Sequence, residues 1–197
     1  RGNPGCRFLH RGSAMRILLL GGSKSGKSGL AQRLARDLSE GNSLYYWATM
    51  EPTDEEDRAR IRRHLADRAG WGFQTVERGR DLPGALHRLD PKGSVLLDSV
   101  TALLANEMFD SKVHDGAPAV VTRDLLRLSG SVANLVCVCD DVFRDAGRYD
   151  PVTEQYRRGL AQICRALAAE FDVTCEVMLG MPKAYRGENW LRKAGLL

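Results

Sequence analysis

Short apolar runs alternate along the chain with longer stretches in which apolar residues recur every three or four positions. The apolar runs are typical of strands buried on both faces of a parallel sheet, and they cover residues 16–20, 44–48, 94–98, 134–139 and 173–179. The amphipathic stretches predict helices over residues 27–38, 54–66, 82–88, 100–109, 120–128 and 153–171. A shorter strand is expected over residues 71–77. This alternation predicts an α/β fold with a mainly parallel central sheet flanked by helices.

The two ends of the chain do not follow this pattern. Residues 1–14 are rich in Gly and Arg and lack periodicity, so we interpret them as a leader or tag outside the fold. Residues 15–183 are expected to form one domain, which suits a chain of 197 residues. The segment after Pro182 is polar, and we expect residues 184–197 to form a loose tail.

Composition narrows the functional class only slightly. The net charge of +4 suits anionic small molecules such as nucleotides and is no nucleic-acid signature, so no nucleic-acid partner is expected. No apolar run approaches the ~20 residues needed to cross a bilayer, so no membrane span is expected. The five cysteines include no Cys-x-x-Cys pair, which indicates a reducing, cytoplasmic compartment.

The first apolar run leads directly into the pattern G-x-x-x-x-G-K-[ST]. It consists here of Gly21, Gly22, Ser23, Lys24, Ser25, Gly26, Lys27 and Ser28. Glycines let successive N–H groups turn toward a phosphate, and the following helix directs its positive end at the same anion. Lys27 would reach the β- and γ-phosphates, and the Ser28 hydroxyl would ligate Mg²⁺. Because a strand precedes the motif and a helix follows it, we predict a RecA-like P-loop NTPase fold that binds ATP or GTP; the alternative is a glycine-rich turn with an exposed lysine.

Enzymes of this class hold Mg²⁺ with an aspartate at the end of a second strand. Asp98 ends the run of residues 94–98 and is the favoured metal ligand. The alternative is that Asp98 caps the following helix. Asp140 and Asp141 also end an apolar strand and are rivals for the same role.

Further motifs follow the P-loop in a fixed order. They are Ala48-Thr49, the acidic stretch 54–57, Arg60-Ile61, His64, Trp71, Thr75-Val76-Glu77, Leu96-Leu97-Asp98, Thr101 and Asn106. Taken alone, the charged segment around His64 would be a solvated, salt-bridged helix. Together with the P-loop, over residues 15–109, the set resembles the bifunctional adenosylcobinamide kinase / adenosylcobinamide-phosphate guanylyltransferase family.

This resemblance implies two reactions. A nucleoside triphosphate phosphorylates a hydroxyl of adenosylcobinamide, and a histidine then carries GMP from GTP to the product. His64 occupies the position of that histidine, and a neutral imidazole is a competent nucleophile. The resemblance gives Lys27 and Asp98 catalytic roles and places Thr49, Arg60 and Glu77 among the nucleotide-binding residues. It also implies Mg²⁺ as cofactor and a homotrimer.

The second half of the chain departs from the family pattern. Asp140-Asp141-Val142-Phe143 stands where the family carries N-E-V-G, and Cys164-Arg165 stands where it carries an Asn-Gln pair. The close, Leu179-Gly180-Met181-Pro182, fits the family's G-x-P. Two alternatives therefore remain open. The first is a P-loop kinase of another small alcohol or nucleotide, without nucleotidyl transfer, and the second is a regulatory P-loop ATPase or GTPase.

Overall fold

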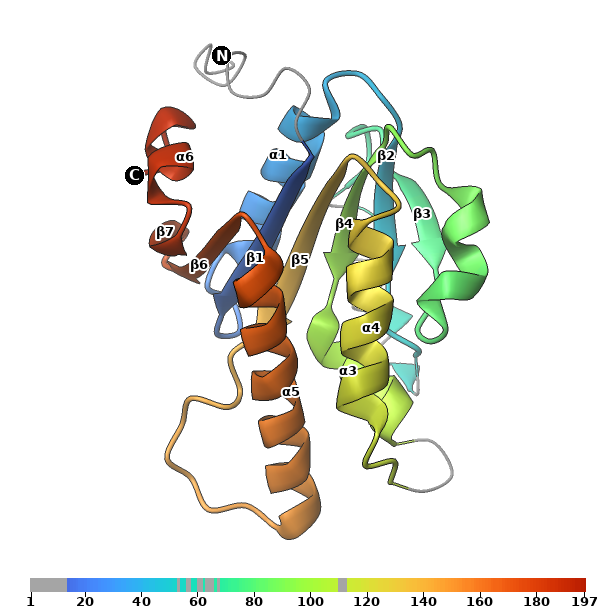
Figure 1. The fold of residues 1–197 in the computed structure, drawn as a ribbon, viewed down its shortest axis with the longest axis vertical. Coiled ribbons are helices and arrows are strands. Elements are labelled where there is room, and N and C mark those ends of the chain that lie inside the picture. The colour runs from blue at the N-terminus through green and yellow to red at the C-terminus, as the bar shows by residue number, and fades with distance from the viewer. Residues whose placement is uncertain are drawn as a thin grey trace.

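A computed structural model describes residues 14–52, 54–55, 58–59, 62, 66, 68–109 and 113–197. Within these residues the chain forms a seven-stranded sheet with helices on both faces (Figure 1). The strands are β1 (Met15–Gly21), β2 (Leu44–Ala48), β3 (Gln74–Glu77), β4 (Ser94–Asp98), β5 (Asn134–Asp140), β6 (Val173–Met178) and β7 (Met181–Arg186). The helices are α1 (Lys27–Ser39), the 3-10 helix η2 (Leu82–Arg88), α3 (Val100–Met108), α4 (Ala117–Ser129), α5 (Pro151–Glu170) and α6 (Glu188–Lys193).

The strand order is β3-β2-β4-β5-β1-β6-β7. Every neighbouring pair is parallel except β6 and β7, which are antiparallel. In this register Gly21 lies beside Asp140, and Ala48 lies beside both Glu77 and Asp98. The carboxyl ends of β1 to β5 therefore share one edge of the sheet, which is where open α/β folds bind their ligands. The predicted fold class is confirmed.

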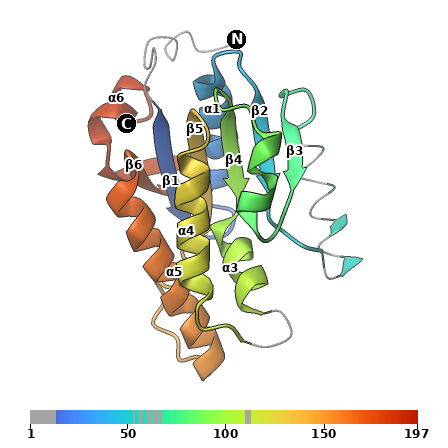
Figure 2. The same cartoon turned by 45° about the vertical axis from the view of Figure 1, so that its right-hand side comes forward.

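Each face of the sheet has its own hydrophobic core. Successive side chains of β1 alternate between them, since Leu18 belongs to one core and Ile17 and Leu19 to the other. Residues from η2, α3, α4 and α5 complete the core that contains Leu18, and residues from α1 and α6 complete the second. Figures 1 and 2 show α3, α4 and α5 together on one face of the sheet and α1 on the opposite face.

The expectation of a loose tail after Pro182 is wrong. β7 pairs with the outer edge of β6, and α6 places Leu191, which is fully buried, in the core on the α1 face. Polar residues dominate this segment because most of its side chains face solvent, whereas one leucine and the strand pairing fix its position. The proposed leader, apart from Ala14, lies outside the described residues.

Other differences from the predicted elements are small. Residues 82–88 form a 3-10 helix, with Pro83 in the first turn and Asp81 accepting a hydrogen bond from the Gly84 N–H. The long helix starts at Pro151, where the Asp150 side chain caps it. Among the described residues, no helix is both long and apolar enough to cross a membrane.

Candidate functional site

The P-loop joins β1 to α1 at the carboxyl edge of the sheet. Its backbone is left-handed at Lys24 (φ 58°) and at Gly26 (φ 93°), and α1 begins directly after Gly26. In the part of the chain that the structure describes, no side chain caps the first N–H groups of α1. A helix start with uncapped N–H groups carries partial positive charge and favours anions. The loop therefore has the strand, turn and helix arrangement that phosphate binding requires.

The turn between β6 and β7 packs directly against this loop. The Gly180 N–H donates a hydrogen bond to the Ser25 carbonyl oxygen at 2.7 Å. A Cβ atom on Gly26 would come within 2.8 Å of the Gly180 Cα, so the approach requires glycine at position 26. The turn that leads into the last strand is thus part of the support for the P-loop.

Lys27 is held from two sides. Its ammonium donates to the Gly22 carbonyl oxygen at 3.0 Å and forms an ion pair with the Asp140 carboxylate at 2.7 Å. The Asp140 N–H donates to Thr101 Oγ1 at 2.8 Å, which fixes the end of β5. One of the two rival acids therefore contacts the P-loop lysine, and it does so because β5 is the immediate neighbour of β1.

Asp98 belongs to a different group of side chains. Tyr46 Oη donates a hydrogen bond to Asp98 Oδ2 at 2.8 Å. Burial, followed by the negative charge of Asp98, raises the pKa of Tyr46 well above its usual value, so Tyr46 remains a donor. The guanidinium of Arg68 lies 3.3 Å from the centroid of the Tyr46 ring. The three side chains form a stack in which Arg68 lies over the Tyr46 ring and the Tyr46 hydroxyl contacts the Asp98 carboxylate.

Arg68 is buried without full compensation. It is 6% exposed, and its Nη1 atom has no hydrogen-bond partner in the described part of the chain. A buried cation normally requires a carboxylate or several acceptors, because desolvation disfavours its charge. Among the described residues Arg68 forms no salt bridge, and the aromatic face of Tyr46 compensates only part of the cost.

Arg68 lines a cavity of about 750 Å³ beside the ends of β2, β3 and β4. Asp98 and Glu77 also line it, together with arginines at positions 58, 62, 78 and 80. Each of these four arginines is paired with a carboxylate: Arg58 and Arg62 with Glu55, Arg78 with Asp81 and Arg80 with Glu51. Arg68 therefore differs from the other arginines of this wall, and we call this space the arginine cavity.

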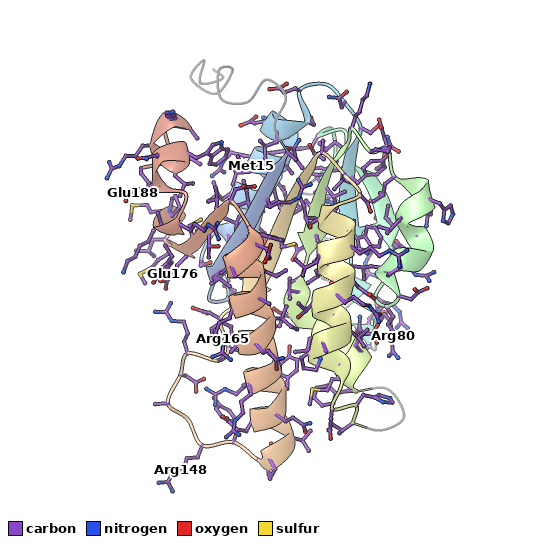
Figure 3. The ribbon with its side chains drawn as sticks, viewed as in Figure 1. Met15, Arg80, Arg148, Arg165, Glu176 and Glu188 are labelled. Atoms are coloured by element: carbon purple, nitrogen blue, oxygen red, sulfur yellow. The ribbon has the colours of Figure 1, made fainter. Side chains whose placement is uncertain are left out.

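A second cavity, of about 740 Å³, lies beside the ends of β1, β5 and β6. Gly22, Ser23, Asp140 and Glu176 are among its lining residues, and we call it the P-loop cavity. Figure 3 shows Glu176 and Arg80, one from each cavity, on opposite flanks of the molecule.

The other acids of the P-loop cavity have partners of their own. Arg144 forms ion pairs with both Asp141 and Glu176, and Tyr185 Oη donates to Glu176 at 2.8 Å. The Tyr185 hydrogen bond, with the Arg144 contact, lowers the pKa of Glu176. The charges of these two acids are thus compensated without Lys27.

Mg²⁺ fits the oxygen donors at this edge of the sheet. Ser28 lies in the first turn of α1, and Asp98 and Asp140 end β4 and β5. Hydroxyl and carboxylate oxygens are the ligands that Mg²⁺ prefers, usually combined with phosphates of the substrate. Among the described residues no group of three His, Cys, Asp or Glu side chains is placed to hold a metal, so the fit is to an ion shared with a nucleotide.

Comparison with known proteins identifies the family. The pattern of the family described as cobinamide kinase / cobinamide phosphate guanyltransferase, CobU, matches residues 17–184. The chain belongs to the CobU family. The predicted resemblance is confirmed, and it extends through the second half of the chain.

Two curated relatives illustrate the range of similarity. The bifunctional adenosylcobalamin biosynthesis protein CobP of Pseudomonas aeruginosa is 30% identical over 178 residues, which is 88% of this chain and 99% of that protein. CobU of Escherichia coli is 39% identical over 97 residues, and this match spans 49% of this chain and only 51% of the relative. Among solved structures, the flagellar accessory protein FlaH of Methanocaldococcus jannaschii has a TM-score of 0.50 at 16% identity. The structural match covers 89% of this chain and 80% of FlaH, and it shows a shared fold alone.

The structure distributes the predicted site residues of this CobU-family chain over the two cavities. Gly22 and Ser23 of the P-loop border one, whereas Glu77 and Asp98 border the other. The strand that leads into the P-loop and the strand that ends at Asp98 are not neighbours, because β5 lies between β1 and β4. His64 and Arg60 lie outside the described residues, so their roles remain predictions.

Thr49 and the T-x-x-x-x-N motif support the site from within. Thr49 is fully buried, and its Oγ1 donates to the Ser99 carbonyl oxygen and accepts from the Ser99 N–H. Asn106 Nδ2 donates to the carbonyl oxygens of Thr49 and Gly79. These bonds tie the ends of β2, β3 and β4 together. The predicted contact of Thr49 with nucleotide would therefore not use a free hydroxyl.

The two departures from the family pattern have different structural consequences. Cys164 is buried in the core with its Sγ 3.4 Å from that of Cys139, away from both cavities. Asp140 instead contacts the P-loop lysine. Sequence reasoning missed Tyr46 and Arg68, because an aromatic residue in a strand and a single arginine after a charged helix carry no motif. For Gly180, the sequence signal was the family's G-x-P motif at the end of the matched region.

Proposed function

We propose that this CobU-family chain catalyses two successive transfers. A nucleoside triphosphate phosphorylates a hydroxyl of adenosylcobinamide, and GMP then passes from GTP to the resulting phosphate. The observation that carries this proposal is the pairing of an uncapped P-loop with a separate cavity that contains a buried, incompletely compensated arginine. Two anion-binding features on one edge of the sheet suit an enzyme that handles both a triphosphate and a phosphorylated acceptor.

The kinase step relies on the P-loop. Lys27 and the first N–H groups of α1 would stabilise the charge that develops on the γ-phosphoryl group as it passes to the hydroxyl oxygen. Ser28 and Asp98 are the residues proposed to hold Mg²⁺, which when bound supplies charge neutralisation between the phosphates. The acceptor hydroxyl loses its proton in this step, and the nucleoside diphosphate leaves.

The transferase step relies on His64. Its imidazole nitrogen attacks the α-phosphorus of GTP, a P–N bond forms, and the bond to pyrophosphate breaks. The phosphate oxygen of the acceptor then attacks the same phosphorus and releases the histidine. Arg62 and Arg68 flank His64 in the sequence and line the arginine cavity, where Arg68 is placed to neutralise a transferring phosphate.

Two labels separate the two activities. With α-labelled GTP and Mg²⁺, the wild-type protein should acquire an acid-labile label that His64→Ala does not acquire. With γ-labelled nucleotide, both proteins should phosphorylate adenosylcobinamide. A wild-type protein that stays unlabelled would remove the transferase and leave a kinase alone. Failure to phosphorylate any corrinoid, with intact nucleotide binding, would remove the proposed acceptor.

We also propose a homotrimer. The support is an exposed apolar group on the last strand pair, formed by Met178, Leu179, Met181 and Tyr185. β7 ends the strand order, so a second copy would cover a sheet edge as well as these side chains. Light scattering coupled to size exclusion should give three times the chain mass; a monomer at all concentrations would contradict the proposal.

A further inference from the structure

The P-loop lysine has an anionic partner before any nucleotide binds. The Asp140 carboxylate lies 2.7 Å from Lys27 Nζ, and the lysine side chain is only 9% exposed. A third donor of the ammonium remains for a ligand, since one proton faces Gly22 and one faces Asp140. A phosphate that approaches Lys27 must therefore share it with a carboxylate or displace that carboxylate.

The backbone of Asp140 is fixed at the end of β5. Its N–H is bonded to Thr101 Oγ1, and the parallel pairing of β5 with β1 places it beside Gly21. The adjoining acids Asp141 and Glu176 are paired with Arg144, so that arginine is already engaged. Lys27 is the sole ion-pair partner of Asp140 within the described residues.

We propose that Asp140 makes the P-loop selective for the magnesium complex of a nucleoside triphosphate over the metal-free nucleotide. This inference rests on the proposed function, because it assumes that the loop binds a triphosphate. A bare triphosphate brings its full negative charge next to the Asp140 carboxylate, and the two repel each other across the shared ammonium. A divalent cation on the phosphates lowers that charge, and its positive charge is attracted to the carboxylate.

The same reasoning explains why this residue, and not its neighbours, has the effect. Asp141 and Glu176 share an ion-pair partner in Arg144, and Glu176 also accepts from Tyr185, whereas neither contacts Lys27 in the described residues. Removing the charge of Asp140 leaves Lys27 entirely to the ligand. Binding of the metal-free nucleotide should gain most, and binding of the magnesium complex should change little.

The test is a titration of the whole protein with a fluorescent ATP analogue, once with Mg²⁺ and once with EDTA. The measured quantity is the dissociation constant in EDTA divided by the dissociation constant with Mg²⁺. We expect this ratio to be large in the wild type. Asp140→Asn should lower this ratio about tenfold, mainly through tighter binding in EDTA. Asp140→Ser removes the same charge with a smaller side chain and should act in the same direction, so the inference does not depend on one variant folding.

Asp145→Asn is the matched control. Asp145 lines the same cavity but pairs with Arg157 and accepts from Tyr149, and it does not contact Lys27. Its ratio should stay within about twofold of the wild type. An unchanged ratio in folded Asp140→Asn and Asp140→Ser would overturn the inference while leaving the kinase proposal intact. A wild-type protein that binds nucleotide under neither condition would overturn the proposed function itself.

Discussion

The P-loop and the arginine cavity present positive charge in opposite ways. In the P-loop, Lys27 is already neutralised by Asp140 and by a backbone carbonyl. In the arginine cavity, Arg68 is more deeply buried than any other arginine of that wall, and within the described residues it lies against the aromatic face of Tyr46 and forms no salt bridge. To bind an anion, the first site must share its cation with a carboxylate or displace that carboxylate, whereas the second holds a cation whose charge an anion would neutralise. The comparison shows that a cation in a cavity says little until its existing partners are known.

The largest expected effect concerns the P-loop. Lys27→Ala removes the ammonium and leaves Asp140 facing the incoming phosphates, so phosphorylation of adenosylcobinamide should slow by about 1,000-fold. The double variant Lys27→Ala with Asp140→Asn should recover part of the lost nucleotide affinity. Initial-rate and binding measurements on both proteins test this. Equal affinity of the single and double variants would show that the ion pair does not affect binding.

The next effect concerns the arginine cavity. Arg68→Met keeps an unbranched side chain but removes the charge, so GMP transfer should fall by about 100-fold. The melting temperature should not fall, because this buried cation has no carboxylate partner among the described residues and such a cation contributes little net stability. Arg62→Met is the control, since Arg62 is exposed and paired with Glu55. If the rate of GMP transfer falls equally in both variants, the burial of Arg68 does not give it a distinct role in transfer. The contrast with Lys27 is then not supported.

A smaller effect is expected from the stack that carries Asp98. Tyr46→Phe retains the ring beneath Arg68 but removes the donor to Asp98 Oδ2. Activity should fall about tenfold because the carboxylate is no longer oriented, and the free energy of unfolding should fall by about 1 kcal/mol. Chemical denaturation and steady-state rates measure the two quantities. A change in stability alone would mean that the orientation of Asp98 has no functional role.

The smallest effect concerns the compensated acids of the P-loop cavity. The pKa of Glu176 is lowered in the folded protein by Tyr185 and Arg144, so its contribution to stability is present above the ordinary glutamate pKa. That contribution is lost as the pH falls through the lower, folded value. Glu176→Gln should therefore reduce the melting temperature by a few degrees at pH 7 and progressively less in acid, with little change in nucleotide affinity. A constant difference across this pH range would contradict the assignment.

Local sequence patterns predicted most of the elements because burial and helix periodicity are local properties. The strands at residues 44–48 and 94–98 coincide with the observed ones, and α1 begins at Lys27 as expected. The tail was misjudged because its pairing partner, β6, and its anchor, Leu191, act through contacts that hydropathy does not reveal. The 3-10 geometry of residues 82–88 depends on a turn around Pro83 and Asp81 that periodicity alone does not distinguish from an α-helix.

The sequence by itself determined that a phosphate-binding loop joins a buried strand to a helix, since every part of that motif is contiguous in the chain. It also pointed to the CobU family, through spaced motifs that need no coordinates. Only the tertiary structure decided which acid meets Lys27. Strand order is set by packing between distant segments, and here it places β5 beside β1, so Asp140 reaches the lysine while Asp98 joins Tyr46 and Arg68 at the other cavity.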